Sequence, residues 1–407
     1  MMKCRHCASP LEHVFLDLGF APPSNAYLFS DDLSLPEISY PLKLYVCENC
    51  WLVQTQDFIP AEGLFDKDYS YFSSVSSSWL RHARDFCESM KSRLFLDNES
   101  FVVEIASNDG YLLKNFVDMG VPCLGVEPTE KTAEMAEKQG VATIRRFFDH
   151  DFSEELVKEK GQADLVVANN VYAHVPDIND FTLGLAAILK PKGTLVLEFP
   201  HLMRMIEGDQ FDTVYHEHFS YFSLFTVNRI FRECGLKLVD VDELPTHGGS
   251  LRVYGAHEAD TRAISDSVAA ILEREKSCGL QQLSTYLGFN KRAERIKVAF
   301  LDYLIDRYKA GRVVVGYGAA AKGNTLLNYS GVKKDLLPFI VDAAPSKQGK
   351  FLPGSHIPVL NPDALWVENI DEVIIFPWNI SDEIKEQLSG LSEKGVAVFT
   401  LFEVIEI

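Results

Sequence analysis

The feature that most constrains the fold is a regular alternation of apolar runs and amphipathic segments that begins at Phe101. The runs FVVEIA, VPCLGV, VATI, ADLVVANN and TLVLEFP are short and end in small or polar residues. The segments between them show helical spacing of apolar residues, and several stop at a glycine. Strands that alternate with helices pair in parallel, so this pattern predicts a doubly wound α/β sheet. The runs LKLVDVDELP and GSLRVYGAHE are expected to close it.

A second α/β rhythm follows a charged helical stretch that we expect over residues 259–310. It begins at GRVVVGYGAAAKGN and continues through LLPFIVD, DEVIIFP and GVAVFTLF. This pattern predicts a second, shorter Rossmann-like unit. The chain is therefore expected to form three parts, over residues 1–65, 66–258 and 259–407.

The N-terminal part contains two CxxC pairs, Cys4 with Cys7 and Cys47 with Cys50. Zinc prefers four tetrahedral ligands, and two such pairs supply four thiolates from two tight turns. A redox pair or unliganded thiols are the alternative interpretations. Four protein ligands leave no open coordination position, so we expect a structural rather than a catalytic zinc.

The charge and hydropathy of the chain exclude several classes of partner. The chain has 39 Lys and Arg residues and 58 Asp and Glu residues, which gives a net charge of −19. This acidic balance argues against binding to nucleic acid or to a membrane surface, because both need a positive footprint. There is no apolar run of the length that spans a membrane, and the start MMKCRHCASP lacks a signal-peptide core. We therefore expect a cytoplasmic protein.

Acidic residues follow the first two predicted strands, where a doubly wound sheet binds its ligand. The first strand leads through Glu104 into the turn Ala106–Gly110, and the second ends at Glu127. Acids repel a dinucleotide pyrophosphate but suit a cationic ligand such as the sulfonium of S-adenosylmethionine. Glu127 lies where an acid commonly accepts ribose hydroxyls. The alternative role for Glu127 is a charge at a helix N-terminus.

The fourth strand ends in ANNVYAHVPD, which places Asn169, Asn170 and His174 at the same edge of the sheet. The two asparagines are candidates for contact with a methyl donor. His174 is a candidate for the substrate side. Taken alone, however, His174 is more typical of a helix cap or a hydrogen-bonded core histidine.

The segment TVYHEHFSYFS places two histidines and a glutamate among aromatic residues. Acid–base chemistry, a metal site and a structural role are all open for His216 and His218. The metal site is disfavoured because the spacing is not HExxH and no third ligand is nearby. In a regular strand Tyr215 and Glu217 would face one side and His218 the other. Their convergence therefore requires a loop or a bulge.

The C-terminal segment GYGAAAKGNT predicts a strand, a turn and a helix. It lacks the GxGxxG spacing, but the helix start with Lys322 nearby favours an anion. A turn that only packs helix against strand is the alternative. Arg252, in HGGSLRVY, is equally compatible with a phosphate and with an acidic side chain as its partner.

Nine segments in order resemble one family, the zinc-containing, S-adenosylmethionine-dependent sugar C-methyltransferases of deoxysugar biosynthesis. They are CRHC…CENC, YSYFSSVSSSW, EIASNDG, GVEPT, NNVYAHVPD, EFPHL, YHEHFSYFS, HGGSLRVY and GYGAAAKGNTLLNY. The resemblance covers essentially the whole chain. One departure is Ala106, where the family turn usually has glycine.

The resemblance implies a zinc-binding domain, a central class I methyltransferase Rossmann-like domain and a C-terminal Rossmann-like domain that helps bind a nucleotide sugar. It implies methylation at C-3 of a dTDP-linked 4-keto-deoxysugar, in a monomer or small homo-oligomer. His218 matches the catalytic base, and Glu217, Tyr215, His174 and Tyr69 match neighbouring catalytic positions. The expected donor-binding residues are Glu104, Ala106, Asn108, Asp109, Gly110, Glu127, Phe148, Asn169 and Asn170. The expected substrate-binding residues are Tyr71, His247, Arg252, Lys322 and Asn324, and the expected zinc ligands are Cys4, Cys7, Cys47 and Cys50.

Two other classes of function compete with this interpretation. An NAD-dependent sugar-nucleotide oxidoreductase would use the glycines of GYGAAAK, but their spacing is wrong and no clear ribose-binding acid follows. A noncatalytic zinc-ribbon protein would have lost the polar residues at the strand ends. Glu104, Asp109, Glu127 and His218 are all present.

Overall fold

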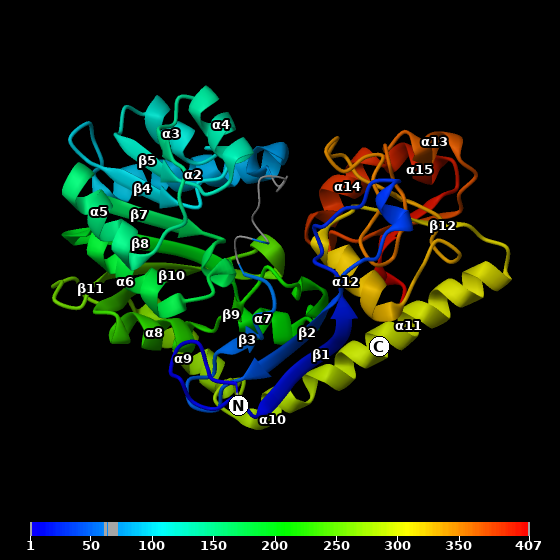
Figure 1. Cartoon of the computed structure of the whole chain (residues 1–407), viewed down its shortest axis with the longest axis horizontal. Helices are drawn as coiled ribbons and strands as arrows, with labels where there is room; N and C mark the ends of the chain where they lie inside the picture. The colour runs from blue at the N-terminus through cyan, green and yellow to red at the C-terminus, as the bar shows by residue number, and fades with distance from the viewer. Residues whose placement is uncertain (1, 61–62, 64–71, 406–407) are drawn as a thin grey trace. The chain divides into compact units, whose positions relative to one another are not determined.

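The computed structural model describes residues 2–60, 63 and 72–405 (Figure 1). Two compact units are built from non-contiguous parts of the chain. The first comprises residues 1–13, 46–204 and 218–283, and the second comprises 14–45, 205–217 and 284–407. The chain passes from the second unit to the first between Glu217 and His218.

The first unit is built on a seven-stranded sheet with the order β10-β11-β8-β7-β4-β5-β6. Strands β4 to β8 pair in parallel, whereas β11 pairs antiparallel with both β8 and β10. The order reverses between β4 and β7, which is the ligand-binding position of a doubly wound sheet. The strands are β4 (Val102–Ile105), β5 (Cys123–Val126), β6 (Thr143–Ile144), β7 (Ala163–Asn169), β8 (Leu189–Pro200), β10 (Leu236–Leu244) and β11 (Ser250–His257).

Helices connect these strands and bury their apolar sides, and several have a polar residue as N-cap. The side chains of Asp149, Asp177 and Ser223 each accept a backbone N–H in the first turn of α5, α6 and α8. A core that includes Phe86, Phe116 and Val167 fills one face of the sheet. The helices are α2 (Ser77–Leu94), α3 (Leu113–Asp118), α4 (Glu130–Lys138), α5 (His150–Lys160), α6 (Ile178–Ile188), α8 (Leu224–Glu233) and α9 (Asp266–Ser277), and α7 (Leu202–Glu207) begins in this unit.

A short antiparallel pair completes the first unit beside the two CxxC turns. Strand β3 (Val53–Thr55) follows the second CxxC turn and pairs with β9 (Ser220–Tyr221). The segment directly before β9 contains His218. The CxxC region and the YHEHF segment are therefore joined by backbone hydrogen bonds.

The second unit has an all-parallel five-stranded sheet with the order β14-β13-β12-β15-β16. Its strands are β12 (Val314–Tyr317), β13 (Ile340–Val341), β14 (Val359–Leu360), β15 (Glu372–Ile375) and β16 (Ala397–Thr400). Its helices are α11 (Phe289–Lys309), α12 (Ala321–Ser330), α13 (Ala364–Val367), α14 (Ser381–Gln387) and α15 (Ser389–Glu393), and α10 (Leu283–Leu287) leads into it.

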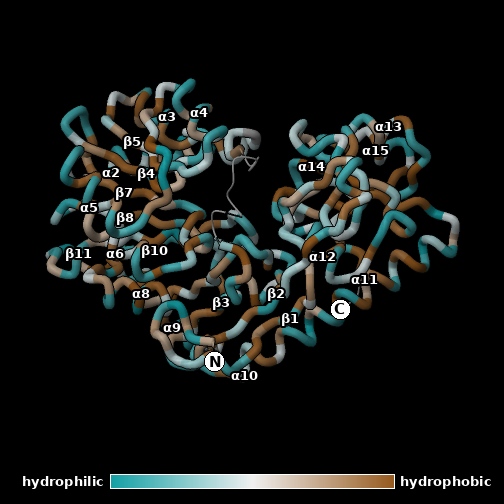
Figure 2. The backbone as a smooth tube through the Cα atoms, viewed as in Figure 1, coloured by the Kyte–Doolittle hydropathy of each residue, from teal (hydrophilic) through white to brown (hydrophobic). Residues whose placement is uncertain are grey.

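Most of the residues between the two CxxC pairs belong to this second unit. It contains most of β1 (His13–Ala21) and β2 (Tyr40–Val46). Phe15 of β1 stacks on Phe289 at the start of α11, with ring centroids 4.6 Å apart. Hydrophilic and hydrophobic residues alternate along α11, as expected of a helix with one buried side (Figure 2).

The predicted α/β fold class is confirmed in both units. The first sheet has the predicted parallel strands and the two closing strands, and the second sheet is the predicted shorter Rossmann-like unit. The stretch expected to be helical over 259–310 contains α9, α10 and α11. No helix in the described part of the chain has the length and hydrophobicity needed to cross a lipid bilayer.

Candidate active site

The turn after β4 lies at the point where the strand order reverses. Ala106, Asn108 and Gly110 all have positive φ, at 56°, 50° and 78°. A Cβ at Gly110 would meet Ala136 of α4 at 3.1 Å, so glycine allows the turn to pack closely on that helix. Ala106 holds a left-handed conformation that glycine adopts without strain.

Three carboxyl groups gather at the ends of β4 and β5. Glu104, Asp109 and Glu127 are 1%, 1% and 4% exposed. Burial raises the pKa of Glu104 well above its ordinary value, and the charges of Glu127 and Asp109 raise it further. Glu104 Oε2 and Asp109 Oδ1 have no hydrogen-bond partner among the described residues. This buried acidic group suits a cationic ligand and disfavours a pyrophosphate.

Glu127 is held by the turn that follows β4. Its two carboxylate oxygens accept the backbone N–H groups of Asn108 and Thr129, each at 2.9 Å. Oε1 also accepts the Thr129 hydroxyl at 2.5 Å, so Oε2 is the carboxylate oxygen with capacity for a ribose hydroxyl. The turn and the acid thus fix each other, which is compatible with the predicted role of both in donor binding.

The carboxyl end of β7 adds further polar atoms at the same edge of the sheet. Asn169 Oδ1, Asn170 Nδ2 and Ser107 Oγ are buried without a partner in the part of the chain that the structure describes. Buried polar atoms without partners are rare in folded proteins, and a missing ligand is one standard explanation. The residues present therefore fit a polar, cationic ligand at the reversal point.

Phe148, the remaining predicted donor-binding residue, lies just before α5. Its ring packs edge-on against Phe181, at 5.3 Å between centroids, and against Phe152. Gly184 approaches the Phe148 ring so closely that a Cβ there would meet it at 2.9 Å. Phe148 is thus part of an aromatic contact between α5 and α6.

The two histidines that the sequence suggested for catalysis come together in the first unit. His174 ends the short 3-10 helix η3 (Tyr172–His174), which follows closely after β7. Its ring centroid lies 4.7 Å from that of His218, with 63° between the ring planes. The backbone N–H of Phe219 donates to the carbonyl of Ala173 at 2.8 Å, which ties the two segments together. His218 is 8% exposed.

The YHEHF segment is irregular, as the alternation of its side chains predicted. The 3-10 helix η4 (Phe211–Thr213) precedes it, and regular strand structure resumes only at Ser220. The inferred departure from strand geometry is therefore confirmed.

A buried hydrogen-bond network holds the part of the chain that follows the YHEHF segment, at the start of α8. Glu275 of α9 accepts the backbone N–H groups of Leu224 and Phe225 at the start of α8, at 2.5 and 2.9 Å. It also pairs with His201 Nε2 at 2.7 Å, with both side chains fully buried. The backbone of residue 202 in turn donates to the carbonyl of Phe222. No local sequence pattern indicates the pairing of Glu275 with His201, because it joins distant positions in the chain.

Tyr215 and Glu217 belong to the second unit. Glu217 is buried, and Asn25 Nδ2 donates to its Oε1 at 3.0 Å. Burial raises the pKa of Glu217, because the charged form loses its hydration. Burial lowers the pKa of His216, whose ring lies edge-on to Tyr40. His216 is therefore held as a neutral core histidine.

Of the predicted substrate-binding residues in the first unit, Arg252 has an internal partner. Its Nε donates to Glu198 Oε1 at 2.6 Å, and His82 Nε2 pairs with Glu198 Oε2 at 2.9 Å. The sequence left either a phosphate or an acidic side chain open as the partner of Arg252. In the described residues Arg252 pairs with the acidic side chain of Glu198. His247 has a φ of 54°, and its ring lies edge-on to Trp79 at 5.3 Å. The predicted residues Tyr69 and Tyr71 lie outside the described residues.

Lys322 and Asn324 lie at the start of α12 in the second unit. Lys322 Nζ donates to Asn379 at 2.7 Å and lies 4.1 Å from the centroid of Trp378. Burial lowers the pKa of Lys322 to about 8, opposed by the charge of Asp212. Asn324 is buried, and its Nδ2 donates to the carbonyl of Ser24.

The glycines of GYGAAAKGNT have a packing explanation. A Cβ at Gly316 or Gly323 would clash with Phe376, and one at Gly318 would clash with Pro377. These glycines allow β12 and α12 to pack against the end of β15. The pattern therefore needs no dinucleotide to explain it.

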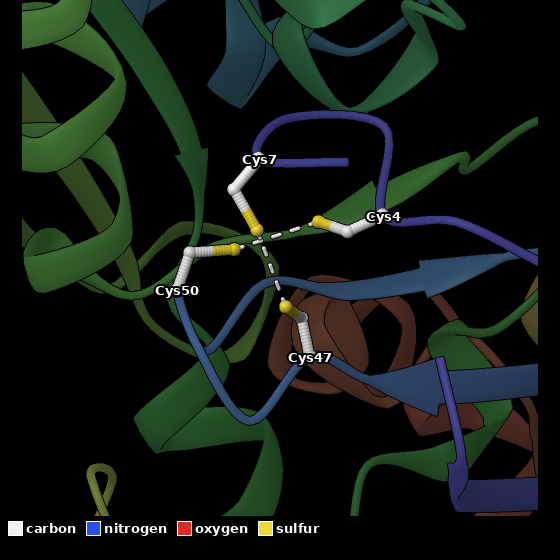
Figure 3. A group of neighbouring side chains, drawn as sticks. All are labelled: Cys4, Cys7, Cys47 and Cys50. Atoms are coloured by element: carbon white, nitrogen blue, oxygen red, sulfur yellow. Dashed lines mark hydrogen bonds between the residues drawn. The ribbon is translucent and has the colours of Figure 1, made fainter. Parts of the chain in front are cut away.

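The four cysteines of the CxxC pairs converge in the first unit (Figure 3). Their sulfur atoms all lie within 4.8 Å of one another, and the Cys4–Cys50 and Cys7–Cys47 pairs are each 3.5 Å apart. A tetrahedral zinc with Zn–S bonds of about 2.3 Å needs sulfur atoms about 3.8 Å apart. The four thiolates therefore fit a zinc ion, with every ligand position supplied by the protein.

Comparison with known families agrees with this arrangement. The chain matches a putative zinc binding domain over residues 4–65, a methyltransferase domain over 79–241 and a C-methyltransferase C-terminal domain over 245–402. These matches define a methyltransferase with a zinc-binding domain, and they confirm the predicted cofactors, S-adenosylmethionine and zinc. The C-methyltransferase NovU of Streptomyces niveus is 34% identical over 393 residues, 97% of this chain and 93% of NovU. The chain belongs to the C-methyltransferase family that includes NovU.

Solved methyltransferase structures resemble part of the chain at low identity. Magnesium protoporphyrin IX methyltransferase from Synechocystis, with bound S-adenosylhomocysteine, is 15% identical and covers 47% of this chain and 91% of its own, at a TM-score of 0.35. A methyltransferase from Anabaena variabilis is 14% identical and covers 43% of this chain and 84% of its own, also at 0.35.

Proposed function

We propose that this C-methyltransferase methylates C-3 of a nucleotide-linked 4-keto-deoxysugar, with dTDP as the expected nucleotide. The observation that carries the proposal is the His174–His218 pair, which lies in the same unit as the buried carboxyl groups of Glu104, Asp109 and Glu127. NovU, a relative over nearly the whole chain, is described as a C-methyltransferase. Attack by carbon requires a carbanion equivalent, and a position beside a ketone is where such a carbon forms most easily.

The base proposed for this step is His218. Its imidazole takes the C-3 proton, and the electron pair of that C–H bond moves into the ketone to give an enolate. An imidazole titrates near neutral pH and suits this task. His174 is proposed to donate a hydrogen bond to the enolate oxygen or to hold the His218 ring. Tyr215 and Glu217 are proposed to orient the sugar.

The three buried carboxyl groups at the ends of β4 and β5 are proposed to hold the donor. Glu104 and Asp109 would attract its positive end, and Glu127 would accept hydrogen bonds from its ribose hydroxyls. When bound, S-adenosylmethionine supplies an electrophilic methyl group and leaves as S-adenosylhomocysteine. The proton on His218 then passes to solvent. The chain's task is thus to align the nucleophilic carbon with the donor and to exclude water.

Titration calorimetry with S-adenosylhomocysteine and with NAD tests the class of donor. We expect S-adenosylhomocysteine to bind and NAD not to bind. Glu104→Gln and Asp109→Asn should each weaken S-adenosylhomocysteine binding, and Asp363→Asn, at an exposed site in the second unit, is the matched control. Binding of NAD without S-adenosylhomocysteine would instead support the oxidoreductase alternative.

A further inference from the structure

Arg5, between the first two cysteines, makes an unusual set of contacts for a residue in a CxxC turn. Its Nη1 donates to the carbonyl of Pro176 at 2.6 Å and its Nη2 to the carbonyl of Thr55 at 2.9 Å. The guanidinium also lies 5.5 Å from the centroid of the Phe219 ring and pairs with Asp57 at 2.7 Å. Its side chain is 8% exposed. A buried arginine thus joins three separate segments.

Two of these segments contain the paired histidines. Pro176 follows His174 by two positions, and Phe219 follows His218 directly. Thr55 reinforces the second link, because its N–H donates to the carbonyl of Phe219 at 3.0 Å and its hydroxyl to that of His218 at 3.4 Å. The guanidinium therefore binds the backbone of the His174 segment directly, and it reaches the His218 segment through the Phe219 ring and through Thr55.

Contacts within and around the first CxxC turn fix the position of Arg5. The backbone N–H of Arg5 donates to Gln54 Oε1 at 2.9 Å, and Gln54 Nε2 donates to Cys4 Sγ at 3.2 Å. Outer contacts of this kind orient the residues around a metal site. A displacement of Cys4 would therefore move the Arg5 backbone and, through its side chain, the two histidine segments.

The ion pair with Asp57 orients Nη2 but is not what stabilises the arrangement. Asp57 is 50% exposed, and ion pairs with an exposed partner contribute little stability. The hydrogen bonds to the carbonyls of Pro176 and Thr55 require two N–H donors at a fixed spacing, and the planar guanidinium supplies them. A lysine ammonium keeps the charge but has no such fork.

We propose that Arg5 is a positioning residue that couples the cysteine site to the His174–His218 pair. It sets the separation of the two imidazoles that the reaction uses, so the inference rests on the proposed function. The first CxxC turn then has a role beyond stabilising the zinc-binding domain. Its geometry determines how well His218 is placed to remove the C-3 proton.

Exchange of the C-3 proton with deuterated water, in the presence of S-adenosylhomocysteine, tests this role without methyl transfer. A dTDP-4-keto-deoxysugar is incubated with each variant, and deuterium at C-3 is followed by NMR. Arg5→Lys should reduce the exchange rate by about 10-fold or more, because misplacing a catalytic group by a fraction of an ångström is costly. Zinc content and the affinity for S-adenosylhomocysteine should stay within about twofold of wild type, since the Arg5 side chain binds Pro176, Thr55 and Asp57 rather than a donor-binding carboxyl group or a zinc ligand.

The matched control is Arg229→Lys. Arg229 donates to the carbonyl of Asn49 in the other CxxC turn at 2.6 Å and pairs with Glu233, so it has a similar position outside the histidine segments. The Arg229→Lys protein should catalyse deuterium exchange at C-3 at the wild-type rate. If Arg5→Lys does not fold, Asp57→Ala removes the carboxylate that orients Nη2, and it should slow exchange about threefold.

Wild-type exchange by Arg5→Lys would overturn the inference, as would wild-type exchange by Asp57→Ala where Arg5→Lys does not fold. A parallel loss of zinc or of S-adenosylhomocysteine binding in Arg5→Lys would also overturn it, because the role would then be general stability. If wild-type enzyme itself shows no exchange, the proposed function fails, and the inference fails with it. The wild-type and variant rates thus separate the two failures.

Discussion

The imidazole rings of His174 and His218 lie 4.7 Å apart between centroids, steeply inclined to each other. They come from segments that follow different strands, and a backbone hydrogen bond from Phe219 to Ala173 joins those segments. Neither histidine alone has a sequence context that demands catalysis. Their convergence near the carboxyl end of β7 is what favours an acid–base role.

Replacing His218 by glutamine should lower the rate of methyl transfer by at least about 100-fold, because the loss of a general base typically costs 100-fold to 10,000-fold. The affinity for S-adenosylhomocysteine should be unchanged, since the carboxyl groups of Glu104, Asp109 and Glu127 are intact. His216→Gln is the neighbouring control and should stay close to wild type. Nearly normal activity of His218→Gln would move the base to His174 or His216.

Cys4→Ser should lower both zinc content and thermal stability, because the metal contributes folding free energy. We expect a fall in melting temperature of about 5 °C or more, since a loss of about 2 kcal/mol shifts the melting temperature of a domain of this size by that amount. Cys278→Ser, at an exposed position, is the control. Normal metal content and an unchanged melting temperature in Cys4→Ser would contradict the zinc assignment.

Ala106→Gly should stabilise the protein by about 1 kcal/mol, because the left-handed conformation is costly for alanine and not for glycine. The φ of Ala106 is 56°. The matched change Ala168→Gly, within β7, should instead destabilise by about 0.5–1 kcal/mol. Denaturant unfolding measures both, and a destabilised Ala106→Gly protein would show that the methyl group has a packing role.

Stability should depend on pH through Asp212 in the second unit. Burial raises the pKa of this carboxyl to about 6, although Lys322 and the Trp378 N–H oppose the shift. Between the unfolded value near 4 and the folded value near 6, the folded state binds more protons than the unfolded state. Stability therefore falls as pH rises through this window, by about 3 kcal/mol for this group.

Asp212→Asn should remove that dependence and melt higher than wild type at pH 7, with the difference vanishing near pH 4. Trp378 Nε1, which donates to Asp212 Oδ2 at 2.7 Å, can donate equally to the amide oxygen. Asp363→Asn, at an exposed site, should leave the pH profile unchanged. A variant that follows the wild-type profile would show that Asp212 titrates normally.

Local chemistry made much of this molecule predictable from its sequence. The residue type and spacing of the two CxxC pairs indicate a metal site formed by Cys4, Cys7, Cys47 and Cys50. The alternation of apolar runs with amphipathic segments predicts the parallel sheets. The irregular YHEHF segment also followed from a local argument, since alternate residues of a strand face opposite sides.

Other features depend on contacts between distant positions and leave no local pattern. Glu198 has the sequence context of an ordinary strand residue, yet it pairs with Arg252, for which the sequence left a phosphate and an acidic side chain equally open as partners. Glu275 reads as one charge on an exposed helix, yet it is fully buried and caps α8. The glycines of GYGAAAKGNT suggested an anion-binding turn, and their close packing on Phe376 becomes visible only in three dimensions.

Mass spectrometry of dTDP-4-keto-deoxysugars incubated with the enzyme and S-adenosylmethionine shows whether the enzyme methylates the sugar carbon. We expect the sugar nucleotide to gain one methyl group, located at C-3 by NMR, with wild-type enzyme and not with His218→Gln. A methyl group on oxygen or nitrogen, or equal product from His218→Gln, would contradict the account.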